Sequence, residues 1–414
     1  MKFKRLCTIG LGYIGLPTSA VLASRGLEVV GVDVNQRAVE AVNRGQVHIV
    51  EPELDVVVQG VVAIGKLRAA YEPVAADAFI VAVPTPFTDG HKPDVSYIEA
   101  ACRKLAPVLK KGDLVVLEST SPVGTTEQMC EWIGALRSDL KMPEYRGQPG
   151  DIFVAHCPER VLPGQVIREL VENDRIIGGV TSECAERAKE LYQIFVQGQC
   201  IVTDARTAEM CKLTENSFRD VNIAFANELS LLCERLGIDV WELIRLANRH
   251  PRVKILQPGP GVGGHCIAVD PWFIVDSAPD LARLIRTARE VNDSKPRHVL
   301  DHIVKACDGK PDPCIACFGL AFKANIDDLR ESPSLEIVHW LVERRDCRVL
   351  AVEPNISTLP KSLAGRANVT LVSVTEALER ADVLALLVDH RQFKGIDKRA
   401  IHGRPVIDTR GIWQ

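Results

Sequence analysis

The sequence predicts an α/β protein with two doubly wound parallel sheets joined by a long central helix. Short apolar runs alternate with helical stretches in both halves of the chain, which is the pattern of parallel β-α-β units. Between the halves, residues 207–236 contain neither proline nor glycine, and Gly237 follows them. We therefore expect one helix of about eight turns there.

The first half begins with an apolar strand at residues 5–9 and a helix that ends near Arg25. A second strand is expected at residues 29–34. Further buried strands are expected at residues 78–83, 114–118 and 152–155, with helices between them. Ser121-Pro122 is expected to begin one of these helices.

The alternation restarts after Pro313, beyond a helix expected at residues 280–293. Strands are expected at residues 315–318, 349–352, 383–388 and 406–408. Ser332-Pro333 should begin a helix, because serine caps helices and proline suits their first position. We expect three domains, at residues 1–206, 207–305 and 306–414.

Composition excludes several classes of protein. The 414 residues are 46% apolar and 25% charged, as in soluble globular proteins. A net charge of −4 gives no basic surface for nucleic acid or an anionic membrane, and no segment reads as a membrane span. Thirteen scattered cysteines favour a reducing cytoplasm over a disulfide framework. Cys314 and Cys317 should face opposite sides of a strand, so no metal site is expected there.

A glycine turn follows the first strand and opens a helix. Gly10, Gly12 and Gly15 have the spacing of the dinucleotide fingerprint of Rossmann-like folds, in which the helix N-terminus receives a pyrophosphate. Asp33, about 20 residues further on, ends the second strand, where an acid binds the ribose 2′-hydroxyl. A carboxylate there repels a 2′-phosphate, so NAD is expected rather than NADP.

Two threonines, Thr85 and Thr120, follow strands of the same predicted sheet. Ligands of parallel sheets bind at the carboxyl ends of strands, although these threonines could also be simple caps. Lys212, Asn216 and Arg219 stack on one face of the long helix. Such a stripe is often a solvated face; the asparagine and the cysteine loop downstream favour a site.

A glycine-dense loop, Gly259-Pro-Gly-Val-Gly-Gly-His-Cys266, presents one cysteine, and Asp270 follows it. Exposed backbone N–H groups beside a thiol suit nucleophilic attack on a carbonyl, with the oxyanion held nearby. The residues leave the role of His265 open, as a structural group or as a hydrogen-bond donor. A dehydrogenase with a nucleophilic cysteine implies oxidation of an alcohol to a carboxylate through a thioester.

One acidic and several basic residues are further candidates for the site. Glu159 could act on a water, and Arg160 beside it could clamp a phosphate. With Lys212, five basic side chains are available for two pyrophosphates: Arg160, Lys212, Arg252, Lys323 and Arg330.

Together these motifs resemble the UDP-glucose/GDP-mannose dehydrogenase family over nearly the whole chain. His265, Ile267 and Val269 around the cysteine resemble its UDP-N-acetylhexosamine branch. The resemblance implies an N-terminal NAD domain, a central helix that forms a homodimer, and a C-terminal domain for the uridine diphosphate. It assigns cofactor contacts to Tyr13, Ile14, Asp33, Thr85, Thr126 and Arg330. It assigns substrate contacts to Arg160, Val161, Lys212, Asn216, Arg219, Gly263 and Lys323, with His250 and Arg252 reaching the neighbouring subunit's site.

The resulting hypothesis is oxidation of UDP-N-acetyl-D-mannosamine at C6 to the uronate, with two NAD per sugar, for enterobacterial common antigen or a related surface polysaccharide. Asp270 through water, or Lys212, would take the hydroxyl proton. Cys266 would attack the aldehyde, with Lys212 and Asn216 at the oxyanion. Glu159 and Thr120 would position the hydrolytic water. UDP-N-acetylglucosamine or GDP-mannose as substrate, a single-step β-hydroxyacid dehydrogenase and a non-catalytic nucleotide-sugar sensor remain alternatives.

Overall fold

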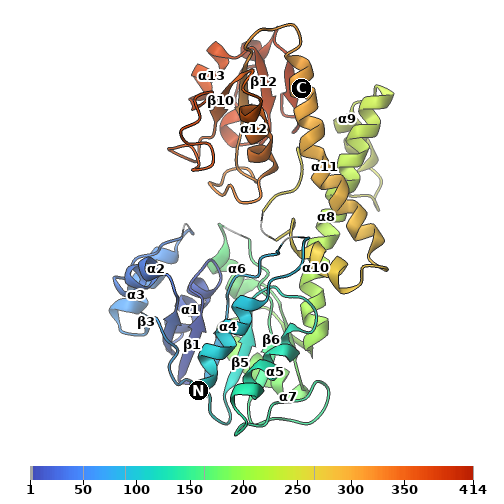
Figure 1. Cartoon of the computed structure of the whole chain (residues 1–414). Coiled ribbons are helices and arrows are strands. Elements are labelled where there is room, and N and C mark those ends of the chain that lie inside the picture. The colour runs from blue at the N-terminus through green and yellow to red at the C-terminus, as the bar shows by residue number, and fades with distance from the viewer. Residues whose placement is uncertain (1–2, 50, 89, 163, 265, 414) are drawn as a thin grey trace. The chain divides into compact units, whose positions relative to one another are not determined.

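The computed structural model describes residues 3–49, 51–88, 90–162, 164–264 and 266–413. The chain forms two compact units, residues 1–215 and 216–414, and each unit contains one sheet (Figure 1). The division falls inside α8 (Ala205–Leu236). The predicted α/β class, with two sheets and a long helix between them in the sequence, is confirmed.

The sheet of the first unit has the strand order β3-β2-β1-β4-β5-β6-β7-β8. Its strands are β1 (Arg5–Ile9), β2 (Glu28–Val32), β3 (Leu67–Ala70), β4 (Ala78–Val81), β5 (Leu114–Leu117), β6 (Phe153–His156), β7 (Arg175–Gly179) and β8 (Cys200–Asp204). All neighbours are parallel except β6 and β7, so the expected all-parallel sheet is interrupted once. Strands β3, β7 and β8 were not predicted; each holds at most three consecutive apolar residues.

Helices cover both faces of this sheet. They are α1 (Gly15–Ser24), α2 (Gln36–Asn43), α3 (Leu54–Ala63), α4 (Ser96–Leu105), α5 (Thr125–Leu136), α6 (Val166–Glu172) and α7 (Ser182–Tyr192), with the short 3₁₀ turn η1 (Ala106–Val108). Leu6 and Ile80 join one core with α1 and α3, whereas Cys7 and Phe79 join a second core with α4 and α5. Alternate residues of β1 and β4 thus contribute to opposite cores, as the doubly wound prediction requires.

The prediction that Ser121-Pro122 begins a helix is wrong. Helix α5 begins at Thr125, after Gly124 adopts a left-handed φ of 98°. The hydroxyl of Ser121 is buried without a hydrogen-bond partner among the described residues, so it caps nothing there. The carboxylate of Glu209 instead accepts the N–H groups of Gly124 and Thr126 at this helix start. A cap from another element cannot be read from local sequence.

The second unit contains the all-parallel sheet β11-β10-β9-β12-β13. Its strands are β9 (Cys314–Phe318), β10 (Arg348–Val352), β11 (Val369–Leu371), β12 (Val383–Leu386) and β13 (Val406–Asp408). Its helices, besides the end of α8, are α9 (Val240–Ala247), α10 (Asp270–Ser277), α11 (Arg283–Ala306), α12 (Pro333–Arg344), α13 (Val374–Arg380), α14 (Arg391–Lys394) and α15 (Lys398–Ile401).

Local signals in this unit were read correctly in three places. Gly237 ends α8 with a φ of 68°. The hydroxyl of Ser332 accepts the N–H of Leu335 and so caps α12. Cys314 and Cys317 lie in different cores on the two faces of β9. Helix α11 differs, because it begins three residues later than expected and continues through Pro296 to Ala306.

Candidate functional site

The three glycines of the turn after β1 have different surroundings. A Cβ on Gly10 would lie 2.2 Å from the carbonyl oxygen of Ala82, and one on Gly15 would lie 1.9 Å from that of Gly10. A Cβ on Gly12 would meet nothing within 4 Å. Gly10 and Gly15 are therefore fixed by packing, whereas Gly12 keeps the outer side of the turn open to a ligand.

Asp33 follows β2 directly and faces this turn. Its carboxylate accepts the N–H of Leu11 and the N–H of Asn35, each at 2.8 Å. Tyr13 is exposed, and Ile14 is half-buried at the N-cap of α1. An open glycine turn, a helix N-terminus and a fixed carboxylate together fit a dinucleotide, with the carboxylate at the ribose position.

The two threonines predicted separately at strand ends are in contact. The hydroxyl of Thr85 donates to the carbonyl oxygen of Thr120 at 2.6 Å. Beside them, the hydroxyl of Ser119 accepts the N–H of Val83 at 2.9 Å and donates to its carbonyl oxygen at 2.7 Å. The loops after β4 and β5 are thus tied together at the ligand-binding edge of the sheet.

Thr126, assigned to the cofactor by resemblance, is fully buried in the structure. Its hydroxyl donates to Glu209 at 2.6 Å, and its N–H donates to the same oxygen at 2.8 Å. Burial raises the pKa of Glu209 to about 7, against the lowering effect of these hydrogen bonds. Glu209 was not predicted as a site residue, since nothing in its local sequence indicates burial.

Glu159, predicted to act on a water, belongs to a buried charge cluster. Its Oε2 lies 2.7 Å from Nη1 of Arg175, and its Oε1 accepts the N–H of Arg160 at 2.7 Å. A second acid, Glu118, accepts the hydroxyl of Tyr192 at 2.7 Å. Burial, and then the charge of Glu159, raise the pKa of Glu118 to about 7. Glu159 pairs directly with the guanidinium, whereas Glu118 is affected by its charge, which lowers the pKa of that acid against the other two effects. Only Glu159 of the three groups was predicted from the sequence.

Arg160 and Val161 follow Glu159 in the loop after β6. The guanidinium of Arg160 binds both carboxylate oxygens of Glu215 on α8, at 2.7 and 3.1 Å. Val161 packs at the margin of a hydrophobic core. On α8, Lys212 and Asn216 are half-buried and Arg219 is exposed.

The cysteine loop is joined to α8 and α10 within the second unit. The amide Nδ2 of Asn216 donates to Oδ2 of Asp270 at 2.5 Å. Asp270 is almost completely buried, and its N–H donates to the carbonyl oxygen of Cys266 at 2.8 Å. Cys266 itself is partly exposed. The hydrogen bond from Asn216 thus joins α8 to Asp270, four residues after Cys266, so three of the predicted catalytic residues form one cluster. His265 lies outside the described residues.

The same loop packs against the segment after β9. A Cβ on Gly263 would lie 2.3 Å from the carbonyl oxygen of Glu331, and the N–H of Gly264 donates to the carbonyl oxygen of Arg330 at 3.3 Å. Lys323 and Arg330 are exposed in this segment, and the guanidinium of Arg330 pairs with Asp328 at 2.6 Å. The predicted glycine therefore lies against the segment that carries the two predicted cations.

His250 and Arg252 occupy an exposed turn after α9, where the N–H of Arg252 approaches Nδ1 of His250 at 3.4 Å. Their exposure leaves both side chains accessible to another molecule.

Comparison with known proteins identifies the family. Models of the UDP-glucose/GDP-mannose dehydrogenase family match residues 4–196 (NAD-binding domain), 206–294 (central domain) and 316–414 (UDP-binding domain). The chain belongs to this family. It is therefore a nucleotide-sugar dehydrogenase, and the resemblance read from the sequence is confirmed.

Several dehydrogenases of this family are similar over the full length. An NDP-N-acetyl-D-galactosaminuronic acid dehydrogenase of Ralstonia nicotianae is 65% identical over 413 residues, covering all of this chain and 97% of that protein. A UDP-N-acetyl-D-mannosamine dehydrogenase of Escherichia coli is 60% identical and covered completely. The structure of a UDP-D-ManNAc dehydrogenase from Pyrococcus horikoshii matches with a TM-score of 0.88 at 40% identity, covering 99% of this chain and 96% of that one.

This nucleotide-sugar dehydrogenase has no helix, among its described residues, that is long and apolar enough to cross a membrane.

Proposed function

We propose that this dehydrogenase oxidises UDP-N-acetyl-D-mannosamine at C6 to the uronate, reducing two NAD⁺ per sugar. The observation that carries the proposal is the cluster of Cys266, Asp270 and Asn216, because a single hydride transfer needs no nucleophile. The 60% sequence identity, over the full length, with enzymes named for this substrate supports the proposal. The product would serve a surface polysaccharide such as enterobacterial common antigen.

The glycine turn and Asp33 are the proposed NAD site. NAD⁺ bound there supplies a hydride acceptor for the C6 carbon. Asp33 would accept the ribose hydroxyls and would repel a 2′-phosphate, which favours NAD⁺ over NADP⁺. The remaining proposed contacts are Tyr13, Ile14, Thr85, Thr126 and Arg330.

The chain's own residues would handle the protons and the carbonyl. Asp270 through a water, or Lys212, takes the proton of the C6 hydroxyl. The thiolate of Cys266 attacks the resulting aldehyde and forms a thiohemiacetal, whose oxyanion Lys212 and Asn216 stabilise. The hydrogen bond from Asn216 to Asp270 supports this role, since it fixes the amide beside the loop.

The second oxidation leaves a thioester on Cys266, which water must hydrolyse. We assign Glu159 and Thr120 to position that water. The ion pair of Glu159 with Arg175 supports this role, because it holds the carboxylate in place. The hydrogen bond between Thr85 and Thr120 fixes the neighbouring backbone.

The proposed substrate contacts belong to three parts of the chain, residues 1–206, 207–305 and 306–414. They are Arg160 and Val161 in the first, Lys212, Asn216, Arg219 and Gly263 in the second, and Lys323 in the third. His250 and Arg252 would reach the substrate of a second subunit, so the proposal includes a homodimer.

An exposed apolar row on α8 supports the homodimer. Phe218, Phe225 and Leu232 recur every seven residues, with 70, 52 and 48% of their surfaces exposed. A seven-residue repeat of large apolar side chains is the pattern of a helix that packs on another helix. A second copy of α8 offers a matching row, as a two-fold interface requires.

A second candidate substrate is favoured by one finding. The Ralstonia relative, named for an N-acetyl-D-galactosaminuronic acid, is more similar to this chain than the mannosamine enzymes are, at 65 against 60% identity. The two sugars differ in configuration at C2 and C4. Relative activity on the two UDP-sugars therefore decides between these candidates.

The deciding experiment measures NADH released from limiting amounts of the UDP derivatives of N-acetylmannosamine, N-acetylgalactosamine, N-acetylglucosamine and glucose, and of GDP-mannose. We expect the wild type to release two NADH per UDP-N-acetylmannosamine. Cys266→Ser should release at most one, because its reaction should stop at the aldehyde. Preferential use of the galacto sugar would replace the proposed substrate. Release of one NADH per sugar by the wild type would exclude the thioester intermediate. Release of no NADH from any of these sugars would favour a non-catalytic nucleotide-sugar sensor.

A further inference from the structure

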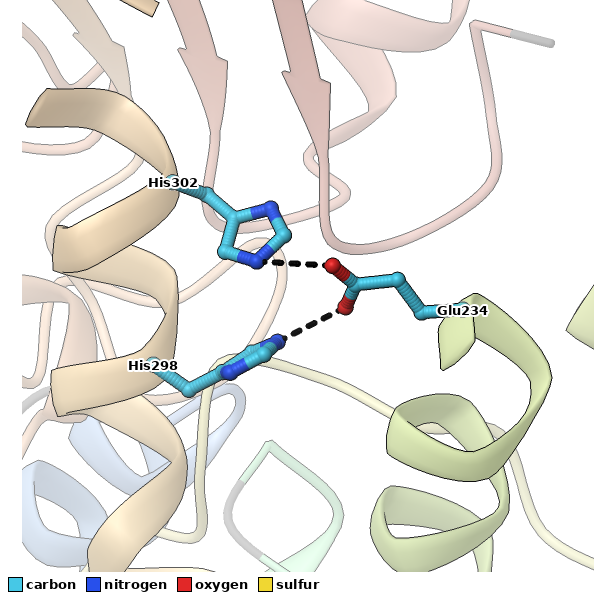
Figure 2. Close-up of side chains that lie close together, drawn as sticks. All are labelled: Glu234, His298 and His302. Atoms are coloured by element: carbon cyan, nitrogen blue, oxygen red, sulfur yellow. Dashed lines mark hydrogen bonds and ion pairs between the residues drawn. The ribbon is translucent and has the colours of Figure 1, made fainter. Parts of the chain in front are cut away.

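Two helices of the second unit are joined by a polar seam that ends in two histidines. Lys295 on α11 donates to the hydroxyl of Ser230 on α8 at 2.7 Å. One turn further along both helices, Glu234 of α8 extends between His298 and His302 of α11 (Figure 2). The proposed catalytic residues and the proposed dimer row do not include any member of this group.

The geometry of the three side chains is that of a ligand set. Nε2 of His298 lies 2.9 Å from one carboxylate oxygen of Glu234, and Nε2 of His302 lies 2.9 Å from the other. All three ligand atoms lie within 4.8 Å of one another. Zinc bonds of about 2.0–2.2 Å in a tetrahedral site place neighbouring ligand atoms roughly 3.3 Å apart. Small rotations of the side chains would therefore admit an ion.

Helix spacing makes the two histidines a pair. Residues four apart lie on the same face of a helix, so His298 and His302 present their rings together, with centroids 4.4 Å apart. Imidazole nitrogen with one carboxylate is a donor set that zinc uses in sites where water completes the coordination. Solvent has access, since the three side chains are 34 to 46% exposed.

We propose that Glu234, His298 and His302 bind one Zn²⁺ ion, which cross-links α8 to α11. The ion would sit where the Nε2 groups and the carboxylate now meet, with water in the remaining position. Its role would be structural, because it would hold α11 at His298 and His302 against the end of α8 at Glu234. Lys295 is a cation near His298, and its hydrogen bond holds it one turn away at Ser230. This charge opposes a metal ion and should limit the affinity.

The test measures zinc bound to the full-length protein after chelator treatment, by equilibrium dialysis and elemental analysis. His298→Gln and His302→Gln each keep an N–H donor for Glu234 but lose the ligand nitrogen. We expect each to bind this ion at least about 100-fold more weakly than the wild type, because losing a ligand should cost more than losing a supporting contact. His339→Gln on α12 removes a histidine elsewhere and should bind zinc normally.

Zinc could instead bind to cysteine thiolates elsewhere in the chain. A measurement on the wild-type protein alone distinguishes the two kinds of site. X-ray absorption of the zinc-loaded chain should show only nitrogen and oxygen neighbours near about 2.0–2.2 Å, whereas thiolate lies near about 2.3 Å. A sulfur shell, or equal zinc binding by wild type and His298→Gln, would overturn the proposal. Zinc should also raise the melting temperature of wild type but not of His302→Gln.

Discussion

Nη1 of Arg175 donates to Oε2 of Glu159 across 2.7 Å, and both side chains are buried, at 1 and 6% exposure. Burial alone would lower the pKa of Arg175, but the nearby acidic groups, Glu159 first among them, raise it above its usual range. Arg175 therefore stays charged inside the first unit. A residue of the proposed hydrolytic machinery depends on a cation that lies 16 residues away in sequence.

Arg175→Met should destabilise the protein by about 3–5 kcal/mol, because it leaves an unpaired buried carboxylate. The measurement is the free energy of unfolding from urea titration. The matched control is Arg168→Met, which removes an exposed pair with Glu172 and should leave the free energy of unfolding almost unchanged. Equal costs for the two variants would show that burial of the Arg175 pair has no energetic consequence.

Glu118 should make stability depend on pH. Its pKa rises from 4.5 in the unfolded chain to about 7 in the folded protein, so folding favours the protonated acid. This contribution is fully present below pH 4.5 and is lost as pH rises towards 7, by at most about 1.4 kcal/mol per pH unit. Glu118→Gln mimics the neutral acid and should be increasingly more stable than wild type between pH 5 and 8. A difference that is constant with pH would contradict this assignment.

The sequence predicted what depends on apolar periodicity and local turn chemistry. Strands such as β1, the end of α8 and the cap at Ser332 follow from adjacent residues. The buried charges do not, because the burial of Glu118, Glu209 or Arg175 is decided by elements distant in the chain. Asn216 and Asp270 were each proposed as catalytic, but their direct hydrogen bond depends on how α10 packs against α8.

Two glycine substitutions should separate folding from cofactor binding. Gly15→Ala places a methyl 1.9 Å from a backbone carbonyl oxygen and should cost about 1–3 kcal/mol of stability. Gly12→Ala adds a methyl to open space at an ordinary φ, so stability should hold. If the pyrophosphate lies there, the KM for NAD⁺ should rise at least about tenfold, a loss of roughly 1.4 kcal/mol. An unchanged KM for NAD⁺ would show that the pyrophosphate does not bind beside Gly12.

Phe225→Glu should convert the proposed homodimer into a folded monomer. In the single chain this side chain is 52% exposed, so a glutamate there is solvated and the monomer should keep its fold. In a dimer the same position would meet its own copy or a neighbouring apolar residue, and burying the charge would cost several kcal/mol. Light scattering after gel filtration should then give the mass of one 45.5 kDa chain instead of two.

The control is Leu284→Glu on α11. Leu284 is also strongly exposed but lies outside the apolar row, so this variant should leave the mass unchanged. If both variants remain dimeric, α8 does not form the interface, and the proposal that His250 and Arg252 act across it loses its support.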